Sequence, residues 1–257
     1  MCAYIATFVG SGYVAVVIGF RNPQWLALLA AVVATLATVG AFERFQFPIG
    51  LSGPPVRAMR ELLWGSLFAA ILIGICDLLI MASTPIRHAR GSGLPWRELV
   101  AVYVPAALHE ELAFRGYIFQ KLRRWRRGAA FLFSGGVFAA LHLQNDAVTA
   151  LAIGNIALAG VMLALAYERF GRLWFPIGVH FVWNLASGPV LGYGVSGYAS
   201  SASLFVTRGG GAEWLTGGAF GIEGSLWATA VEVAAVAVLW RGRPVGVDVD
   251  QYAVSSR

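Results

Sequence analysis

Three short motifs place chemically active side chains inside strongly apolar stretches of this chain. They are HEELAFRG at 109–116, FAALH at 138–142 and HFVWN at 180–184. Ionisable groups are costly inside a membrane and are usually kept there for function. Carboxylates, imidazoles and a carboxamide are also the groups that hydrolysis by an activated water needs. The three motifs therefore predict one hydrolytic site.

The two adjacent glutamates of the first motif differ if this segment is helical. Glu111 and Arg115 are four residues apart with the glutamate first, the favourable order for an ion pair within a helix. Glu110 points about 100° away from Glu111 and cannot share that pair. Glu111 and Arg115 are thus predicted to support the site, and Glu110 is the candidate base. In the alternative interpretation, both glutamates form only packing salt bridges.

The other two motifs supply partners for Glu110 at a similar depth. Phe138 and His142 are four residues apart, as are His180 and Asn184, so each pair shares one face of a helix. Helical rise puts Glu110 roughly 16 Å, His142 roughly 20 Å, and His180 and Asn184 roughly 11–18 Å above the inner ends of their predicted spans. This common layer predicts a polar cavity near the middle of the membrane.

Two kinds of hydrolytic chemistry fit these residues. In the first, Glu110 and His142 activate a water, and His180 and Asn184 donate hydrogen bonds to the oxyanion, with no cofactor. In the second, Glu110, His142 and His180 hold a zinc ion with an open water position. A zinc helix of the HExxH type is excluded, because Ala113 stands where its second histidine would be.

The composition indicates that the motifs lie on membrane helices. The chain has 257 residues, of which 58% are hydrophobic and only 12% charged, and its mean hydropathy is +0.69. Soluble domains carry about twice that charge. Several apolar runs approach the roughly 20 residues that cross a bilayer. We therefore predict a single all-α domain over 1–257, a polytopic membrane helical bundle of about eight transmembrane helices. The predicted spans are 2–20, 24–42, 63–82, 99–120, 129–146, 147–167, 173–191 and 225–240.

The distribution of basic residues predicts the topology. The segments 43–62, 83–98, 121–128 and 192–224 are predicted as loops, the last of them long, irregular and external. With both termini in the cytoplasm, the inner segments hold Arg44, Arg57, Arg60, Lys121, Arg123, Arg124, Arg126, Arg127, Arg169, Arg172, Arg241, Arg243 and Arg257. The outer segments hold Arg21, Arg87, Arg90, Arg97 and Arg208. This excess of inner basic residues favours cytoplasmic termini.

The net charge of +6 is explained by the same loops. Basic loops of a membrane protein contact anionic lipid, so the charge predicts a lipid bilayer as partner and no nucleic acid. Three further ionisable residues lie in predicted spans. Asp77 and Glu232 are interpreted as structural groups at helix interfaces, and His109 as a group that bonds a backbone carbonyl or faces the lipid.

The three motifs resemble a known family. EELAFRG, FAALH and HFVWN match the pattern EExxxR, FxxxH and HxxxN of the CAAX protease and bacteriocin-processing family of intramembrane proteases, which includes the type II CAAX prenyl endopeptidase. TGGAFGIEGS at 216–225 is similar to a stretch of bacterial members. The resemblance covers roughly 95–240, the predicted protease core, and leaves 1–94 as N-terminal membrane helices.

The resemblance implies roles that agree with the residue-level interpretation. Glu110 corresponds to the catalytic glutamate, His142 to its water-activating partner, and His180 and Asn184 to the oxyanion pair. Glu111, Arg115 and Phe138 correspond to supporting positions.

The activity implied is that of an intramembrane endopeptidase. The 18 arginines and one lysine of the chain favour a bacterial cytoplasmic membrane. The substrate is expected to be a membrane-associated peptide or protein, processed in a CAAX-type or a leader- or bacteriocin-like reaction. The family is also labelled metalloprotease, which keeps the zinc alternative open. The alternative function is a non-proteolytic membrane scaffold or immunity protein with the same fold. A proton-coupled carrier is disfavoured, because the chain shows no internal repeat.

Overall fold

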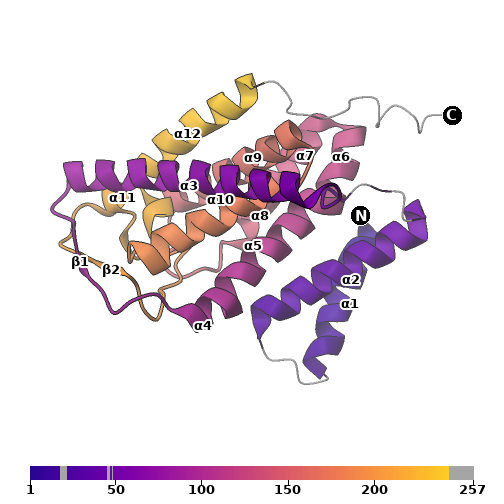
Figure 1. Cartoon of the computed structure of the whole chain (residues 1–257), viewed down its shortest axis with the longest axis horizontal. Coiled ribbons are helices and arrows are strands. Elements are labelled where there is room, and N and C mark those ends of the chain that lie inside the picture. Colours follow the sequence, from indigo (N-terminus) through magenta and orange to yellow (C-terminus); the bar gives the residue numbers. More distant parts are fainter. Residues whose placement is uncertain (18–21, 45–46, 48, 243–257) are drawn as a thin grey trace.

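The computed structural model describes residues 1–17, 22–44, 47 and 49–242, and it is mostly helical (Figure 1). The N-terminal part contains α1 (Cys2–Val17), α2 (Pro23–Glu43) and α3 (Pro55–Ser83). The remaining helices are α4 (Trp96–Glu98), α5 (Val104–Glu111), α6 (Phe119–Trp125), α7 (Arg127–Leu132), α8 (Phe138–Leu141), α9 (Ala150–Phe170), α10 (Trp174–Leu185), α11 (Glu213–Thr216) and α12 (Leu226–Arg241). Two short strands, β1 (Arg87–Arg90) and β2 (Phe205–Arg208), complete the fold.

Wider π-helical turns join several of the shorter helices into longer rods. The turns span Leu99–Tyr103, Leu112–Ile118, Phe133–Val137 and Ala186–Val190. The backbone stays right-handed helical across these junctions, so 96–125 is one continuous rod, as are 127–141 and 174–190. The first and second motifs each lie where a π-helical turn meets an α-helix, a feature that often marks functional sites.

The structure supports an integral membrane protein. α2, α3 and α9 are long and apolar enough to cross a membrane, while α1 and the rod at 127–141 are shorter apolar helices. Within the described residues, helices occupy all eight predicted segments. That each of the eight crosses the bilayer stays a prediction.

Helix ends follow from local sequence. Asn22 caps α2 by accepting hydrogen bonds from the backbone N–H groups of Gln24 and Trp25. Thr149 caps α9, and Gly171 ends it with a left-handed φ of 65°. Side-chain caps of this kind satisfy N–H groups that the first helical turn leaves unpaired. The cap at Thr149 therefore ends the connection between the second motif and α9.

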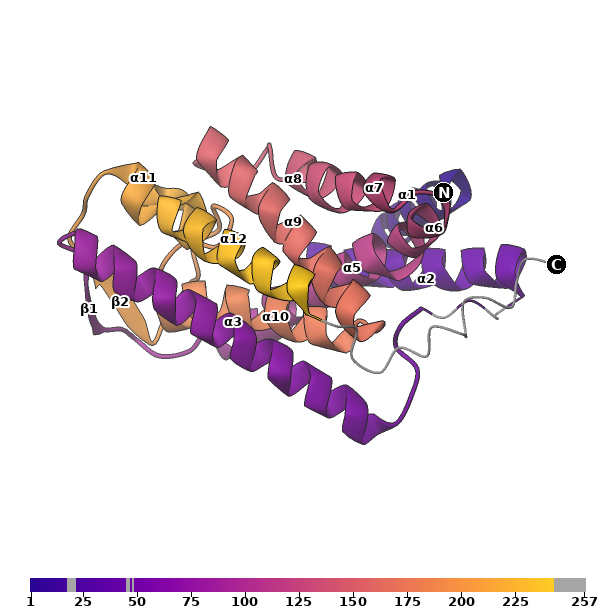
Figure 2. The same ribbon diagram turned by 90° about the horizontal axis from the view of Figure 1, so that it is seen from above.

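Small residues bring the central helices into close contact. α3 and α10 cross closely (Figure 2), and a Cβ atom added at Gly65 or Gly178 would lie 2.1 Å or 2.3 Å from a backbone oxygen of the other helix. Gly160 of α9 meets the carbonyl of Ser134 in the same way, at 2.3 Å. In membrane proteins such small residues permit tight helix packing. α1 and α2 form a separate pair, and α2 packs on α5.

The structure adds one pair of short strands to the predicted all-α fold, at one end of the molecule. β1 and β2 pair antiparallel, with Arg87 opposite Arg208 and Arg90 opposite Phe205. Both strands lie in segments predicted as loops, because four residues such as RHAR carry no alternating apolar pattern. The segment 192–224 also contains α11 and two short 3₁₀ turns, at Gly218–Phe220 and Ile222–Gly224.

Three predicted boundaries also need correction. The span predicted at 129–146 ends at Leu141, and residues 142–149 form the connection to α9, with Ala147 at a φ of 55°. α3 begins at Pro55, inside the predicted loop 43–62, because proline is well accommodated in a first helical turn. α6 continues to Trp125, which shortens the predicted loop 121–128.

Several sequence predictions concern residues outside the described part. They are the end of the first span at 18–20, residues 45, 46 and 48 of the predicted loop 43–62, and the contributions of Arg21, Arg243 and Arg257 to topology.

Candidate active site

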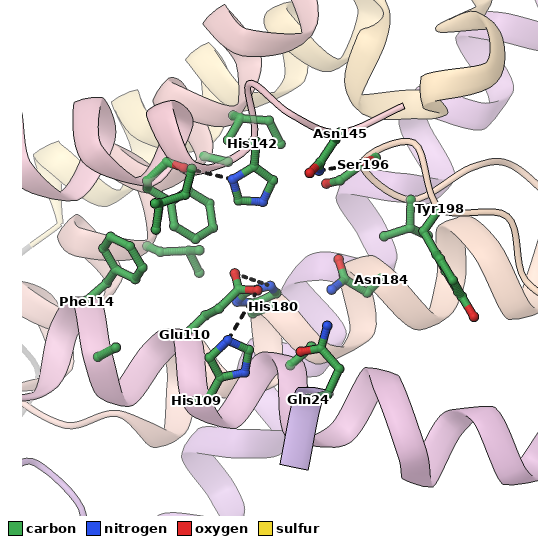
Figure 3. Close-up of a pocket in the computed structure, with 18 of the residues that line it drawn as sticks. Gln24, His109, Glu110, Phe114, His142, Asn145, His180, Asn184, Ser196 and Tyr198 are labelled. Carbon is green, nitrogen blue, oxygen red and sulfur yellow. Dashed lines mark hydrogen bonds and ion pairs between the residues drawn. The ribbon is translucent and has the colours of Figure 1, made fainter. Parts of the chain in front are cut away.

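A cavity of about 1150 Å³ contains the predicted functional residues. Glu110 of α5, His142 at the end of α8, and His180 and Asn184 of α10 all line it (Figure 3). Side chains of α1 and α2 form another wall, and the turn at 195–199 closes one end. The structure therefore brings residues of all three motifs together.

Glu111 and Arg115 do not line the cavity and form a fully buried ion pair. Arg115 Nη1 donates to Glu111 Oε1 at 2.9 Å, and neither side chain is exposed. The other guanidinium nitrogens donate to Ser134 Oγ at 3.2 Å and to the Gly160 carbonyl at 3.1 Å. Removing one partner of such a pair leaves an uncompensated buried charge. The pair has the predicted spacing, and its further bonds tie α9 to this rod.

The carboxylate of Glu111 also holds the third motif. His180 Nδ1 donates to Glu111 Oε1 at 2.9 Å, and His180 Nε2 lies 3.7 Å from Glu110 Oε2. His180 thus bridges the two adjacent glutamates. Sequence reasoning paired Glu111 with Arg115 alone, because a contact between residues 69 positions apart leaves no local signal.

Glu110 faces histidines on more than one side. Its side chain is 21% exposed, and Oε1 lies 3.9 Å from His109 Nε2. His109 Nδ1 donates to the Pro105 carbonyl at 2.9 Å. This bond agrees with one of the two interpretations of His109, but its ring also lines the cavity, which the sequence did not indicate.

His142 lies across the cavity from Glu110 (Figure 3). Its Nδ1 donates to the Phe138 carbonyl at 2.7 Å, and the two rings are 4.8 Å apart. The Phe138 ring also packs under the Arg115 guanidinium at 4.8 Å and edge-on to His180 at 6.2 Å. The Phe138 ring thus contacts the Arg115 guanidinium and lines the cavity, and the Phe138 carbonyl orients the His142 ring.

The three histidines that line the cavity use the same ring nitrogen for their hydrogen bonds to the protein. Each bonds an oxygen acceptor through Nδ1, so Nδ1 carries the hydrogen and Nε2 is left for the cavity. Asn184 lies one helical turn beyond His180, and its carboxamide faces the same space (Figure 3). The arrangement offers a carboxylate, imidazole nitrogens and a carboxamide to one bound group.

The alternative zinc ligands are not assembled in this conformation. In the described part of the chain, no three histidine, cysteine, aspartate or glutamate side chains form a group that could hold a metal ion. Glu110 and His180 lie near each other, but His142 lies across the cavity.

Asp77 and Glu232 lie outside the residues that line the cavity. Asp77 Oδ1 accepts hydrogen bonds from Tyr193 Oη at 2.7 Å and from His88 Nε2 at 2.8 Å. It therefore anchors β1 and the segment after α10 to α3. Glu232 is buried within α12, with 1% of its surface exposed.

Sequence reasoning missed other residues that line the cavity, above all Glu223, Asn145 and Ser196. Glu223 belongs to the TGGAFGIEGS stretch, whose similarity to bacterial family members implies no role for this glutamate. Asn145 and Ser196 lie in connections, where helical spacing gives no signal.

Comparison with known proteins identifies one family. Residues 92–186 match the family model described as type II CAAX prenyl endopeptidase Rce1-like. The matched region contains all three motifs, and it confirms the resemblance found in them. No curated protein and no solved structure matches the chain.

Proposed function

Because residues 92–186 are a domain of the type II CAAX prenyl endopeptidase Rce1-like family, we propose that this integral membrane protein is an intramembrane endopeptidase. The observation that carries the proposal is the position of Glu110. Its carboxylate lies in the cavity between His109 and His180 and faces His142. A carboxylate shielded from bulk water and flanked by imidazoles is suited to general base catalysis.

The proposed reaction is hydrolysis by one activated water. Glu110 takes a proton from the water while Nε2 of His142 accepts its second hydrogen bond. The water oxygen attacks the peptide carbonyl carbon, and the new C–O bond converts the carbonyl oxygen to an oxyanion. Glu110 then returns the proton to the amide nitrogen, and the C–N bond breaks. The products are a carboxylic acid and an amine, so atoms and charge balance.

His180 and Asn184 are proposed to hold the oxyanion. The carboxamide of Asn184 can donate one hydrogen bond, and Nε2 of His180 can donate a second when the ring carries both protons. Glu111 accepts from Nδ1 at 2.9 Å and so keeps the ring aimed at the cavity. With that proton, Glu110, Glu111, Arg115 and His180 together carry no net charge, as a site in lipid requires.

The lining of the cavity supports a membrane-associated peptide or protein as substrate. Ile5 of α1 and Leu141 of α8 line the cavity and are 48% and 65% exposed, so the cavity reaches the apolar outer surface. A substrate segment could therefore reach Glu110 from the bilayer. Either a CAAX-type or a leader- or bacteriocin-like substrate fits this description.

Glu110→Gln tests the proposal, because glutamine keeps the shape of the side chain and removes the base. Cleavage is expected to fall by roughly 10²–10⁴-fold, the usual contribution of a positioned base. The measurement compares peptide termini in membranes that contain the native protein or the variant at equal level.

Glu168→Gln is the matched control. Glu168 pairs with Arg127 outside the cavity, and its substitution should leave the cleavage products unchanged. If Glu110→Gln also leaves every cleavage product in place, the proteolytic proposal is wrong and a scaffold or immunity protein is favoured. Stoichiometric zinc, whose removal abolishes and whose return restores cleavage, would favour the metal alternative.

A further inference from the structure

We infer that Glu223 is a positioning residue that aligns the His142 side of the cavity with the His180 side. The inference concerns the cavity of the proposed function. Only its consequence for catalysis rests on that proposed function. Glu223 lies between α11 and α12, far in sequence from all three motifs. Its side chain bonds Ser196, in the turn next to the His142 connection, and Trp183, in the helix α10 that carries His180 and Asn184.

The Glu223 carboxylate is buried and accepts three hydrogen bonds. Oε2 accepts from the backbone N–H of Ser196 at 2.6 Å and from Ser196 Oγ at 2.7 Å. Oε1 accepts from the indole N–H of Trp183 at 3.1 Å. Only 6% of the residue is exposed. A buried carboxylate needs such donors, and each donor is in turn fixed by it.

The bonds to Ser196 extend to the turn that carries His142. Asn145 Nδ2 donates to the Ser196 carbonyl at 2.8 Å (Figure 3), and the Asn145 backbone N–H donates to the His142 carbonyl at 3.1 Å. Ser196 has a φ of 48°, a left-handed conformation that serine adopts only when its surroundings hold it. Gly197 packs so closely that a Cβ atom there would lie 2.2 Å from the Asp146 carbonyl oxygen.

The bond to Trp183 reaches the helix that carries the proposed oxyanion donors. Trp183 lies between His180 and Asn184 in α10 and is buried. Its indole N–H donates to Glu223, and His180 and Asn184 line the cavity on the same helix. The bond therefore opposes rotation of this part of α10 about its axis.

Glu223 is itself held by the core of the molecule. Asn155 Nδ2 of α9 donates to the backbone carbonyls of Glu223 at 2.7 Å and Ser225 at 2.8 Å. Thr229 Oγ1 of α12 donates to Asn155 Oδ1 at 2.6 Å. Glu223 is thus tied to α9 and α12. The packed helices therefore fix Glu223, and Glu223 in turn fixes Ser196 and Trp183.

Glutamine cannot replace Glu223 in this network. All three of its partners are donors, whereas a carboxamide has one accepting oxygen and an NH₂ group that would face a donor. Glu223→Gln is therefore expected to loosen the 195–198 turn or the Trp183 contact while it preserves volume. This makes it a sharper variant than alanine.

The test is a spectrum of the histidine rings that needs no substrate. The full chain has four histidines, so ¹⁵N-histidine labelling in detergent micelles gives few signals, and a His→Gln variant assigns each. We expect Glu223→Gln to shift the ring-nitrogen signals of His142 and His180 beyond their linewidths. The signal of His88, which bonds Asp77 on α3, should stay in place.

Glu61→Gln is the matched control for losing a buried carboxylate. Glu61 accepts from Arg57 and Arg172, both outside the cavity lining. This control should lower thermal stability and leave all four histidine signals unchanged. If Glu223→Gln behaves like Glu61→Gln, Glu223 serves only stability and the inference is wrong.

Two milder variants keep the test decisive if Glu223→Gln does not fold. Asn145→Ala breaks only the link to the His142 turn and should shift the His142 signal alone. Trp183→Phe removes the indole donor together with part of the ring, and it should shift the His180 signal more than that of His142. Unchanged His142 and His180 signals in these variants would overturn the inference. Because the spectra require no cleavage, they remain valid if Glu110→Gln disproves the proteolytic function.

Discussion

The histidine side chains that line the cavity are oriented by hydrogen bonds from Nδ1, the ring nitrogen that bonds the surrounding protein. His109, His142 and His180 each donate through Nδ1, to the Pro105 carbonyl, the Phe138 carbonyl and the Glu111 carboxylate. A ring held in this way has one tautomer and one direction, which reduces the reorganisation needed during reaction. The supporting partners therefore matter to the chemistry almost as much as the cavity-facing nitrogens do.

Arg115→Met should be strongly destabilising. The guanidinium is fully buried and donates to Glu111, Ser134 and Gly160, so its loss leaves the Glu111 carboxylate without its main counter-charge. Breaking a buried pair in this way costs about 3–5 kcal/mol. Thermal unfolding of the purified protein in detergent should show a much lower midpoint than for the native chain.

Arg123→Gln is the control for that measurement. Arg123 pairs with Glu168 at 3.1 Å, but its side chain is 37% exposed. Exposed pairs contribute about 0–1 kcal/mol, so its midpoint should stay near the native value. Equal midpoints for Arg115→Met and the native protein would contradict a structural role for the buried pair.

The distances within the site depend on helices that pack very closely against each other. α10 holds His180 and Asn184, and it lies against α3 through Gly178 and Gly65. α5 holds Glu110 and Glu111, its π-helical continuation holds Arg115, and α9 meets this rod through the Arg115 bond to Gly160. A shift of either contact would change the distance between Glu110 and His180.

Gly178→Ala should disturb the site although it adds only one methyl group. The new Cβ would lie 2.3 Å from the Leu62 carbonyl oxygen and 3.0 Å from the Ser66 amide nitrogen, both of them backbone atoms. α3 and α10 would have to separate, and overpacking typically costs about 1–3 kcal/mol. The thermal midpoint and the cleavage rate are both expected to fall.

Gly74→Ala provides the comparison within α3. No atom lies within 4 Å of a Cβ atom added there, so alanine should stabilise the helix slightly, by about 0.5–1 kcal/mol. If Gly178→Ala and Gly74→Ala gave the same midpoint and the same activity, close packing of α3 on α10 would not be what positions the site.

The described residues form a helical bundle around the cavity that contains Glu110. α3, α9, α10 and α12 form its packed centre, while α1 and α2 stand as a pair beside α5 (Figures 1 and 2). The cavity lies between these two parts and is lined by both. Access from the bilayer is consistent with this arrangement, because lining residues of α1 and α8 are exposed on the apolar surface.

The predicted topology can be tested with the native cysteines. Cys2 is exposed near the N-terminus and Cys76 is buried. With a cytoplasmic N-terminus, a membrane-impermeant maleimide should label Cys2 in inside-out vesicles and not in intact spheroplasts. Cys2→Ser is the background control. A cysteine placed at Ser256 in that variant reports the C-terminus in the same way, and labelling of either position in spheroplasts would contradict the topology.

Helix locations and the three motifs could be predicted from the sequence because their signals are local. Apolar runs of helical length predicted the segments that α2, α3 and α9 occupy, and spacing of four residues predicted the Glu111–Arg115 pair. Local sequence patterns predicted least where the conformation of the chain depends on residues far away in the sequence. β1 and β2 pair across more than a hundred residues, and the connection at 142–149 was predicted as helix.

The sequence by itself determined that this is a membrane protein and that three short motifs in it carry polar residues at helical spacing. Composition and short-range periodicity are properties of the chain, and they need no knowledge of packing. Only the tertiary structure decided that His180 bonds Glu111, that His109 faces Glu110, and that Glu223 links Ser196 to Trp183. The physical reason is that buried polar groups must find partners, and which partners are within reach depends on how the helices pack.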